Sequence, residues 1–140
     1  MNRERLLKLH DNATRYLRYI QLFHSEIQTT NYALLENISD LEDEGLQIYL
    51  LSQIRGVQCN AKNILHESEH MFRILEEIED DVRENPASFD SKQLEDGRKD
   101  EIKKIVDYVV DKCITLSYNV DDMIALKKKY ARVGKIYSWV

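Results

Sequence analysis

Residues that break helices are scarce in this sequence, which holds four Gly and one Pro among its 140 residues. Pro lacks a backbone N–H and Gly is conformationally free, so both destabilise the interior of a helix. Their scarcity permits long uninterrupted helices over almost the whole chain. We therefore expect an all-α fold.

Cysteines and long apolar runs are also scarce. The chain has only Cys59 and Cys113, too few for a disulfide framework, so we expect two free thiols. No run of about 18 apolar residues occurs that could cross a bilayer. The N-terminal sequence also lacks the apolar core of a secretory signal. We expect an intracellular protein, either cytoplasmic or nuclear.

The sequence does contain three long stretches in which apolar residues recur at alternating intervals of three and four. The first runs from Leu6 to Leu41, the second from Leu50 to Val82, and the third from Ile102 to Met123, with Tyr130 beyond it. This spacing is the heptad pattern of helices that pack side by side, and we call its apolar positions the seam of each helix. We predict a long, rod-shaped, coiled-coil-like three-helix bundle with antiparallel up-down-up topology.

Local signals place the boundaries of these helices. Ser39 and Glu42 have the spacing of a capping box at the start of the second helix. Pro86 should end that helix, and Gly134 should end the third one. The predicted segments are a bundle over residues 1–134, with helices at about 3–38, 40–83 and 99–133, a connecting loop at 84–98, and a C-terminal tail at 135–140.

The distribution of charge favours the antiparallel order. Basic side chains gather within residues 3–15 and acidic ones within residues 76–81, each at the helix end whose dipole it opposes. An antiparallel hairpin would bring these two clusters together, and would likewise join the basic residues within 127–135 to the acidic ones within 40–44. Each exposed pair contributes only about 0.2–1 kcal/mol, so these charges select orientation more than they stabilise the fold.

One catalytic motif occurs, because the segment from His66 to His70 reads His-Glu-Ser-Glu-His and fits the HExxH pattern of zinc peptidases. Ser68 lies on the seam, which places both histidines on the outside of the bundle, where no third ligand could close a catalytic zinc site. Cys59 shares this outer stripe. We predict a solvated face, no enzymatic activity, no cofactor and no small-molecule substrate. A metalloprotein that uses His66, Glu67 and His70 remains an alternative.

Apolar residues at heptad positions that should face water indicate a surface for binding a partner protein. They lie on the first and third helices, and the only tryptophan lies in the tail. A wide core stripe could account for Leu35 and Ile114, which occupy similar positions. The predicted partner-binding residues are Leu7, Leu22, Tyr32, Tyr108, Tyr118 and Trp139. We expect an adaptor, scaffold or assembly subunit that binds another helical protein, or itself, through the outer faces of these two helices.

A basic stretch near the C-terminal end offers a further alternative. Lys127, Lys128 and Lys129 could contact an anionic membrane or nucleic acid through their charge. The formal net charge of -5 argues against a dominant role of this kind. The sequence thus predicts the fold in more detail than the function, and it identifies no partner.

Overall fold

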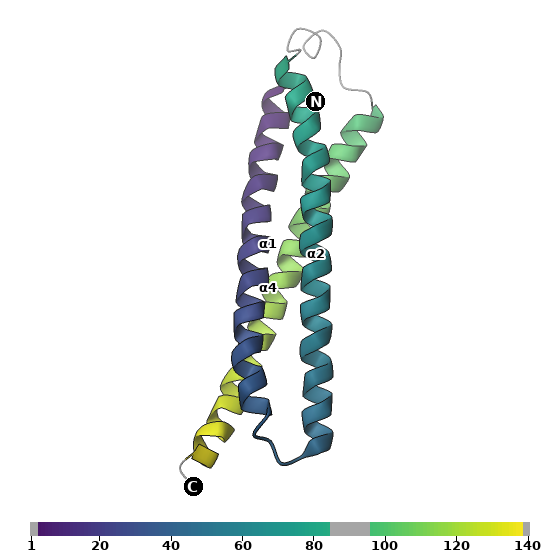
Figure 1. Ribbon diagram of the computed structural model, residues 1–140. Helices are drawn as coiled ribbons and strands as arrows, with labels where there is room; N and C mark the ends of the chain where they lie inside the picture. Colours follow the sequence, from purple (N-terminus) through teal and green to yellow (C-terminus); the bar gives the residue numbers. More distant parts are fainter. Residues whose placement is uncertain (1–2, 85–95, 139–140) are drawn as a thin grey trace. The chain divides into compact units, whose positions relative to one another are not determined.

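The protein is built from α helices. The computed structural model describes residues 3–84 and 96–138, and within them the side chains of residues 4–81, 83–84 and 99–130. The described helices are α1 (Arg3–Ile38), α2 (Glu44–Glu84) and α4 (Asp96–Ser138), drawn in purple to blue, teal, and green to yellow in Figure 1. The predicted all-α class is confirmed, and all three helices pack together as in a helical bundle. None of these helices is long and apolar enough to span a bilayer.

The chain forms two compact units, and each takes one segment from every helix. The first unit comprises Met1–Ile20 and Leu65–Ile114, and the second comprises Gln21–Ile64 and Thr115–Val140. We describe them separately, because each has its own apolar core.

The core of the first unit joins the beginning of α1, the C-terminal half of α2 and the beginning of α4. Leu6, Leu75 and Ile102, one from each helix, are completely buried. Removal of apolar surface from water contributes about 25 cal/mol per Å², so this shared core is the main source of stability in the unit. The remaining buried members of the cluster are Ala13, Leu17, Phe72, Ile78 and Ile105.

The core of the second unit joins the end of α1, the beginning of α2 and the C-terminal half of α4. Its buried residues are Leu34, Ile38, Leu50, Ile54 and Tyr130. Half-buried leucines pack around them from the same helices and from the turn between α1 and α2. They are Leu35, Leu41, Leu46, Leu51 and Leu126.

The predicted seams match the observed burial. Every seam residue whose side chain the structure describes is buried or half-buried. The buried stripe is wider than the seam, because each helix packs against two neighbours rather than one. Leu17, Phe72 and Ile105 are buried although the heptad pattern does not include them.

The turn between α1 and α2 differs from the prediction. α2 begins at Glu44, and the residue that caps it is Asp43, whose carboxylate Oδ1 accepts a hydrogen bond from the Leu46 N–H at 3.1 Å. The Ser39 hydroxyl instead donates to the carbonyl of Glu36 at 2.7 Å, so Ser39 belongs to the end of α1. The predicted capping box is wrong, because Ser39 bonds back to the preceding helix.

The ends of α4 also differ from the prediction. The helix begins at Asp96 and continues through Gly134 to Ser138, so Gly134 does not end it. A glycine permits a helix to end by adopting a left-handed conformation but does not force it, and no described glycine has that conformation. Residues 135–138 therefore belong to α4. The predicted helix stop at Pro86 and the rest of segment 85–95 lie outside the described residues.

Candidate partner-binding surfaces

The predicted partner-binding residues fall into three groups. Leu22, Tyr32 and Tyr118 lie in the second unit and are strongly exposed, by 64%, 74% and 65%. Leu7 and Tyr108 lie in the first unit and are only half-buried. Trp139 lies outside the described residues. The three strongly exposed residues thus share one unit, and the other two described residues do not join them there.

The second unit exposes two further apolar side chains that the sequence analysis missed. Ile48 and Tyr49, near the beginning of α2, are 68% and 57% exposed. They precede Leu50 and Leu51, so four apolar residues follow one another in the sequence. A helix of 3.6 residues per turn cannot turn four consecutive side chains toward one core. This run was the signal that could have revealed an exposed apolar pair on α2.

Tyr32 borders a shallow hollow on the surface of the second unit. The hollow has a volume of about 440 Å³, and Tyr32 shares its lining with Gln28, Thr29 and Gln58. α1 therefore contributes three lining residues and α2 one. Amide side chains around an exposed aromatic ring offer a partner both apolar contact and hydrogen bonds.

Tyr108 makes its polar contacts inside the first unit. Its hydroxyl donates a hydrogen bond to Glu67 Oε2 of α2, and Lys112 Nζ lies 5.6 Å from the centroid of its ring. Partial burial, and then the hydrogen bond and negative charge of Glu67, raise the pKa of Tyr108 well above its usual value of 10.0. The phenol therefore stays protonated and links α4 to α2. It is less available to a partner than Tyr118.

A buried contact between a histidine and a carboxylate joins α1 to α2 in the first unit. Glu79 is only 5% exposed, and its Oε2 lies 2.9 Å from His10 Nε2, although the two groups do not have the alignment of a straight hydrogen bond. Arg83 approaches the other carboxylate oxygen at 2.5 Å. The His10 ring lies against Phe72, with ring centroids 5.3 Å apart. Within the acidic run on α2, Glu79 is thus buried, and the residue of α1 that contacts it is a histidine rather than one of the arginines or lysines of residues 3–15.

The HExxH segment has the placement that the heptad pattern predicts. His66 and His70 are exposed, as is Cys59, while Ser68 is completely buried. Within residues 3–84 and 96–138, no group of three or more His, Cys, Asp or Glu side chains could hold a metal ion. The other thiol, Cys113, is buried in the first unit, and this burial raises its pKa. The arrangement gives the two histidines no third ligand from the described residues.

Uncharged polar side chains interrupt both cores. Asn31 in the second unit is completely buried, and neither atom of its amide has a hydrogen-bond partner. The Ser68 hydroxyl in the first unit is likewise buried without a partner. Each such group costs about 1–3 kcal/mol relative to one that is satisfied. Of these two residues only Ser68 lies on a predicted seam, where buried polar residues can fix the register of packed helices.

The basic stretch near the end of α4 lies on the surface. Lys127, Lys128 and Lys129 are all exposed, and Lys129 Nζ lies 5.6 Å from the centroid of the Tyr130 ring. Tyr130 itself belongs to the core of the second unit. The three ammonium groups are thus accessible to solvent, and they form a short basic segment.

No family model matches the chain, and neither a curated protein nor a solved structure matches it significantly. The function is therefore argued from the arrangement of side chains alone.

Proposed function

We propose that the protein is a non-enzymatic helical adaptor or assembly subunit, which binds another helical protein or a second copy of itself through the second unit. One observation carries this proposal. Of the seven large apolar side chains that are exposed in the described part of the chain, five lie in the second unit. They are Leu22, Tyr32, Ile48, Tyr49 and Tyr118.

The number and type of these residues support a binding surface. Single exposed apolar residues are ordinary on soluble proteins. Among the described residues, the second unit exposes five, drawn from all three helices, against two in the first unit, and exposed apolar area is typical of interaction sites. Three of the five are tyrosines, which are enriched among the residues that dominate binding energy at interfaces. Because Tyr32 is 74% exposed, a partner that covers its ring would remove most of its apolar surface from water.

We also propose the antiparallel up-down-up order for the three helices. In the first unit, Leu6 near the start of α1 shares a core with Ile78 near the end of α2. In the second unit, Ile38 at the end of α1 shares a core with Leu50 near the start of α2. Pairing of opposite helix ends within each unit supports an antiparallel hairpin, since a parallel pair would join like ends.

Two arrangements support a non-enzymatic role. His66 and His70 lie on an exposed helix face, and among the described residues neither belongs to a group of three that could hold a metal ion. Of the buried titratable groups, Glu79 contacts His10 and Arg83, Tyr130 belongs to the core of the second unit, and Cys113 is buried in the first unit. The chemistry-bearing residues are thus used for packing or lie open to solvent.

The test is co-purification of the protein at native abundance, followed by mass measurement of the intact assembly. We expect a mass larger than that of one chain. Substitution of both Leu22→Glu and Tyr118→Glu should weaken the association about tenfold or more, because each carboxylate would be buried against a partner. The helical content, measured by circular dichroism, should not change, since both positions are exposed.

The matched control also introduces two glutamates, one on α1 and one on α4. It places them at exposed positions that are not occupied by large apolar side chains. Gln21→Glu and Ala125→Glu serve this purpose, because both residues are exposed. The control should keep the assembly intact. A monomeric mass at native abundance, or an assembly equally stable in both double variants, would exclude this surface.

A further inference from the structure

A second hollow lies in the first unit, between α1 and α4, and its chemistry differs from that of the second unit. It has a volume of about 480 Å³. α1 contributes Arg5 and Leu9 to its lining. The residues that α4 contributes are Lys99, Asp100, Lys103, Val106 and Asp107. We call this hollow the α1/α4 groove.

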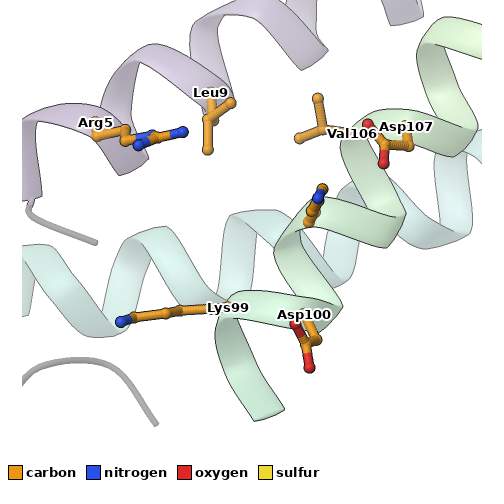
Figure 2. Close-up of a pocket in the computed structure, with 7 residues that line it drawn as sticks. Arg5, Leu9, Lys99, Asp100, Val106 and Asp107 are labelled. Atoms are coloured by element: carbon orange, nitrogen blue, oxygen red, sulfur yellow. The ribbon is translucent and has the colours of Figure 1, made fainter. Parts of the chain in front are cut away.

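The floor of the α1/α4 groove is apolar. Leu9 and Val106 are half-buried and pack against the core of the first unit. Figure 2 shows that these two side chains point toward each other from facing helices. A partner side chain placed over them would extend the core of the unit by one layer. The groove therefore offers an anchor point for an apolar side chain.

The rim of the groove is cationic. Arg5 extends along α1 toward Leu9 (Figure 2), and Lys99 and Lys103 lie one helical turn apart on α4, about 6 Å along the axis. Asp100 is directed away from Leu9 and Val106 (Figure 2). The lining thus carries three cations against two carboxylates, which leaves one positive charge in excess. Figure 2 shows Lys99 directed away from Leu9 and Val106, as Asp100 is, and Asp107 beside Val106.

From this juxtaposition we infer that the α1/α4 groove binds an amphipathic, acidic helix of a partner protein. Apolar residues of that helix would cover Leu9 and Val106, and carboxylates four residues apart would match the spacing of Lys99 and Lys103. The partner helix contacts both α1 and α4, and the charged side chains set its orientation.

This inference adds a surface to the one already proposed and does not depend on it. The second unit offers exposed tyrosines and leucine, whereas the α1/α4 groove combines a small apolar floor with three cations and two carboxylates. An adaptor with two surfaces of different chemistry can hold two different partners. Failure of either surface leaves the other unaffected.

The test uses the full chain and a matched pair of synthetic helical peptides of about 20 residues. Both peptides carry leucines at three- and four-residue spacing along one face. One has glutamates on the flanks of this face, and the other has lysines. We expect the acidic peptide to bind at least about tenfold more tightly than the basic one. Fluorescence anisotropy titrations measure both affinities. In NMR spectra it should shift the methyl signals of Leu9 and Val106.

Charge reversal gives the decisive comparison. The double substitution Lys99→Glu and Lys103→Glu should invert the preference, so that the basic peptide binds more tightly than the acidic one. Because this is a gain of binding, an unfolded variant could not produce it. The control, Lys127→Glu with Lys128→Glu, makes the same change of charge on exposed residues of the second unit and should leave the preference unchanged.

Four results would overturn the inference. They are equal affinity for both peptides, an unchanged preference after charge reversal in the groove, an altered preference in the control variant, and methyl shifts confined to the second unit. A further arm uses dodecanoate and vesicles of phosphatidylcholine with phosphatidylglycerol. Shifts of the Leu9 and Val106 methyls with these lipids but not with the acidic peptide would assign the groove to an anionic lipid and overturn the inference as well.

Discussion

The two units of this protein use polar and apolar residues in opposite ways. In the first unit, charged and polar side chains contact one another between helices, as His10 does with Glu79 and Tyr108 with Glu67. In the second unit, the buried polar residues are uncharged, and large apolar side chains such as Tyr32 lie on the surface. The same heptad pattern therefore occurs in a unit with charged contacts between helices and in a unit that carries five of the seven exposed large apolar side chains of the described residues.

This difference separates the residues that determine stability from those that determine association. Substitutions of cross-helix polar groups in the first unit should change the free energy of unfolding and its dependence on pH. Substitutions of exposed apolar groups in the second unit should change binding with little effect on folding, because their side chains contact water rather than the core. Three stability predictions test this separation.

The largest effect is expected for Glu79→Ala in the first unit. Removal of the carboxylate leaves His10, whose side chain is only 15% exposed, without the group that its Nε2 contacts. Loss of one member of a buried pair is strongly destabilising, and the partial exposure of Arg83 moderates this effect. We therefore expect the free energy of unfolding to decrease by about 2 kcal/mol. The measurement is urea-induced unfolding followed by circular dichroism.

Glu77→Ala provides the matched control for this substitution. It removes the same residue type from an exposed position on the same helix, and it should change stability by less than about 0.5 kcal/mol. Similar losses in the two variants would mean that the contact between His10 and Glu79 contributes nothing, and the contrast between the units would weaken.

Asn31→Leu is expected to stabilise the second unit. Leu has the same branching as Asn but no polar atoms, and the amide of Asn31 is completely buried without a hydrogen-bond partner. Its replacement should remove the cost of an unsatisfied group and raise the free energy of unfolding by about 1 kcal/mol. The corresponding change in the first unit is Ser68→Ala, for which we expect a smaller gain of the same sign.

Measurement of both variants by urea unfolding would sharpen the comparison of the two cores. A loss of stability in Asn31→Leu would show that the amide has a partner or that the larger side chain cannot be accommodated. Intact mass measurement of the same variant also tests the role of Asn31 in register. If Asn31 specifies one packing of the helices, the variant should form additional assemblies.

The buried seams could be predicted from the sequence, because their period alone determines which face of a helix is buried. Leu6, Ile54 and Leu116 are completely buried at predicted seam positions. Glu79 could not be predicted in this way. It lies in an acidic run that resembles a solvated face, and its burial depends on His10, which is distant in sequence and carries no pattern of its own.

The exposure of apolar residues could partly be predicted, because the heptad period also identifies the outward face of each helix. Leu22, Tyr32 and Tyr118 occupy outward heptad positions and are exposed, while their role in binding stays a prediction. Exposure of Ile48 and Tyr49 was missed because the outer face of α2 was judged by its charge. The α1/α4 groove could not be predicted from the sequence. Its cations come from α1 and α4, and only the packing of these two helices brings them together.

The smallest effect is expected at Tyr108, where the prediction concerns pH. Its pKa is raised in the folded protein, so the neutral phenol is favoured by folding. The contribution to stability is therefore complete below the usual pKa of 10.0 and decreases as the pH rises above that value. Tyr108→Phe should remove this decrease and should cost about 0.5 kcal/mol at neutral pH, the low end for loss of one hydrogen bond, because the bond to Glu67 is exposed.

Urea unfolding at neutral pH and at alkaline pH, above 10.0, measures both parts of this prediction. Tyr118→Phe is the control, because Tyr118 is 65% exposed, and it should change neither value. An equal alkaline loss of stability in the wild type and in Tyr108→Phe would assign that loss to other groups. Tyr108 would then be free to take part in binding, and the first unit would resemble the second more closely than the contact with Glu67 indicates.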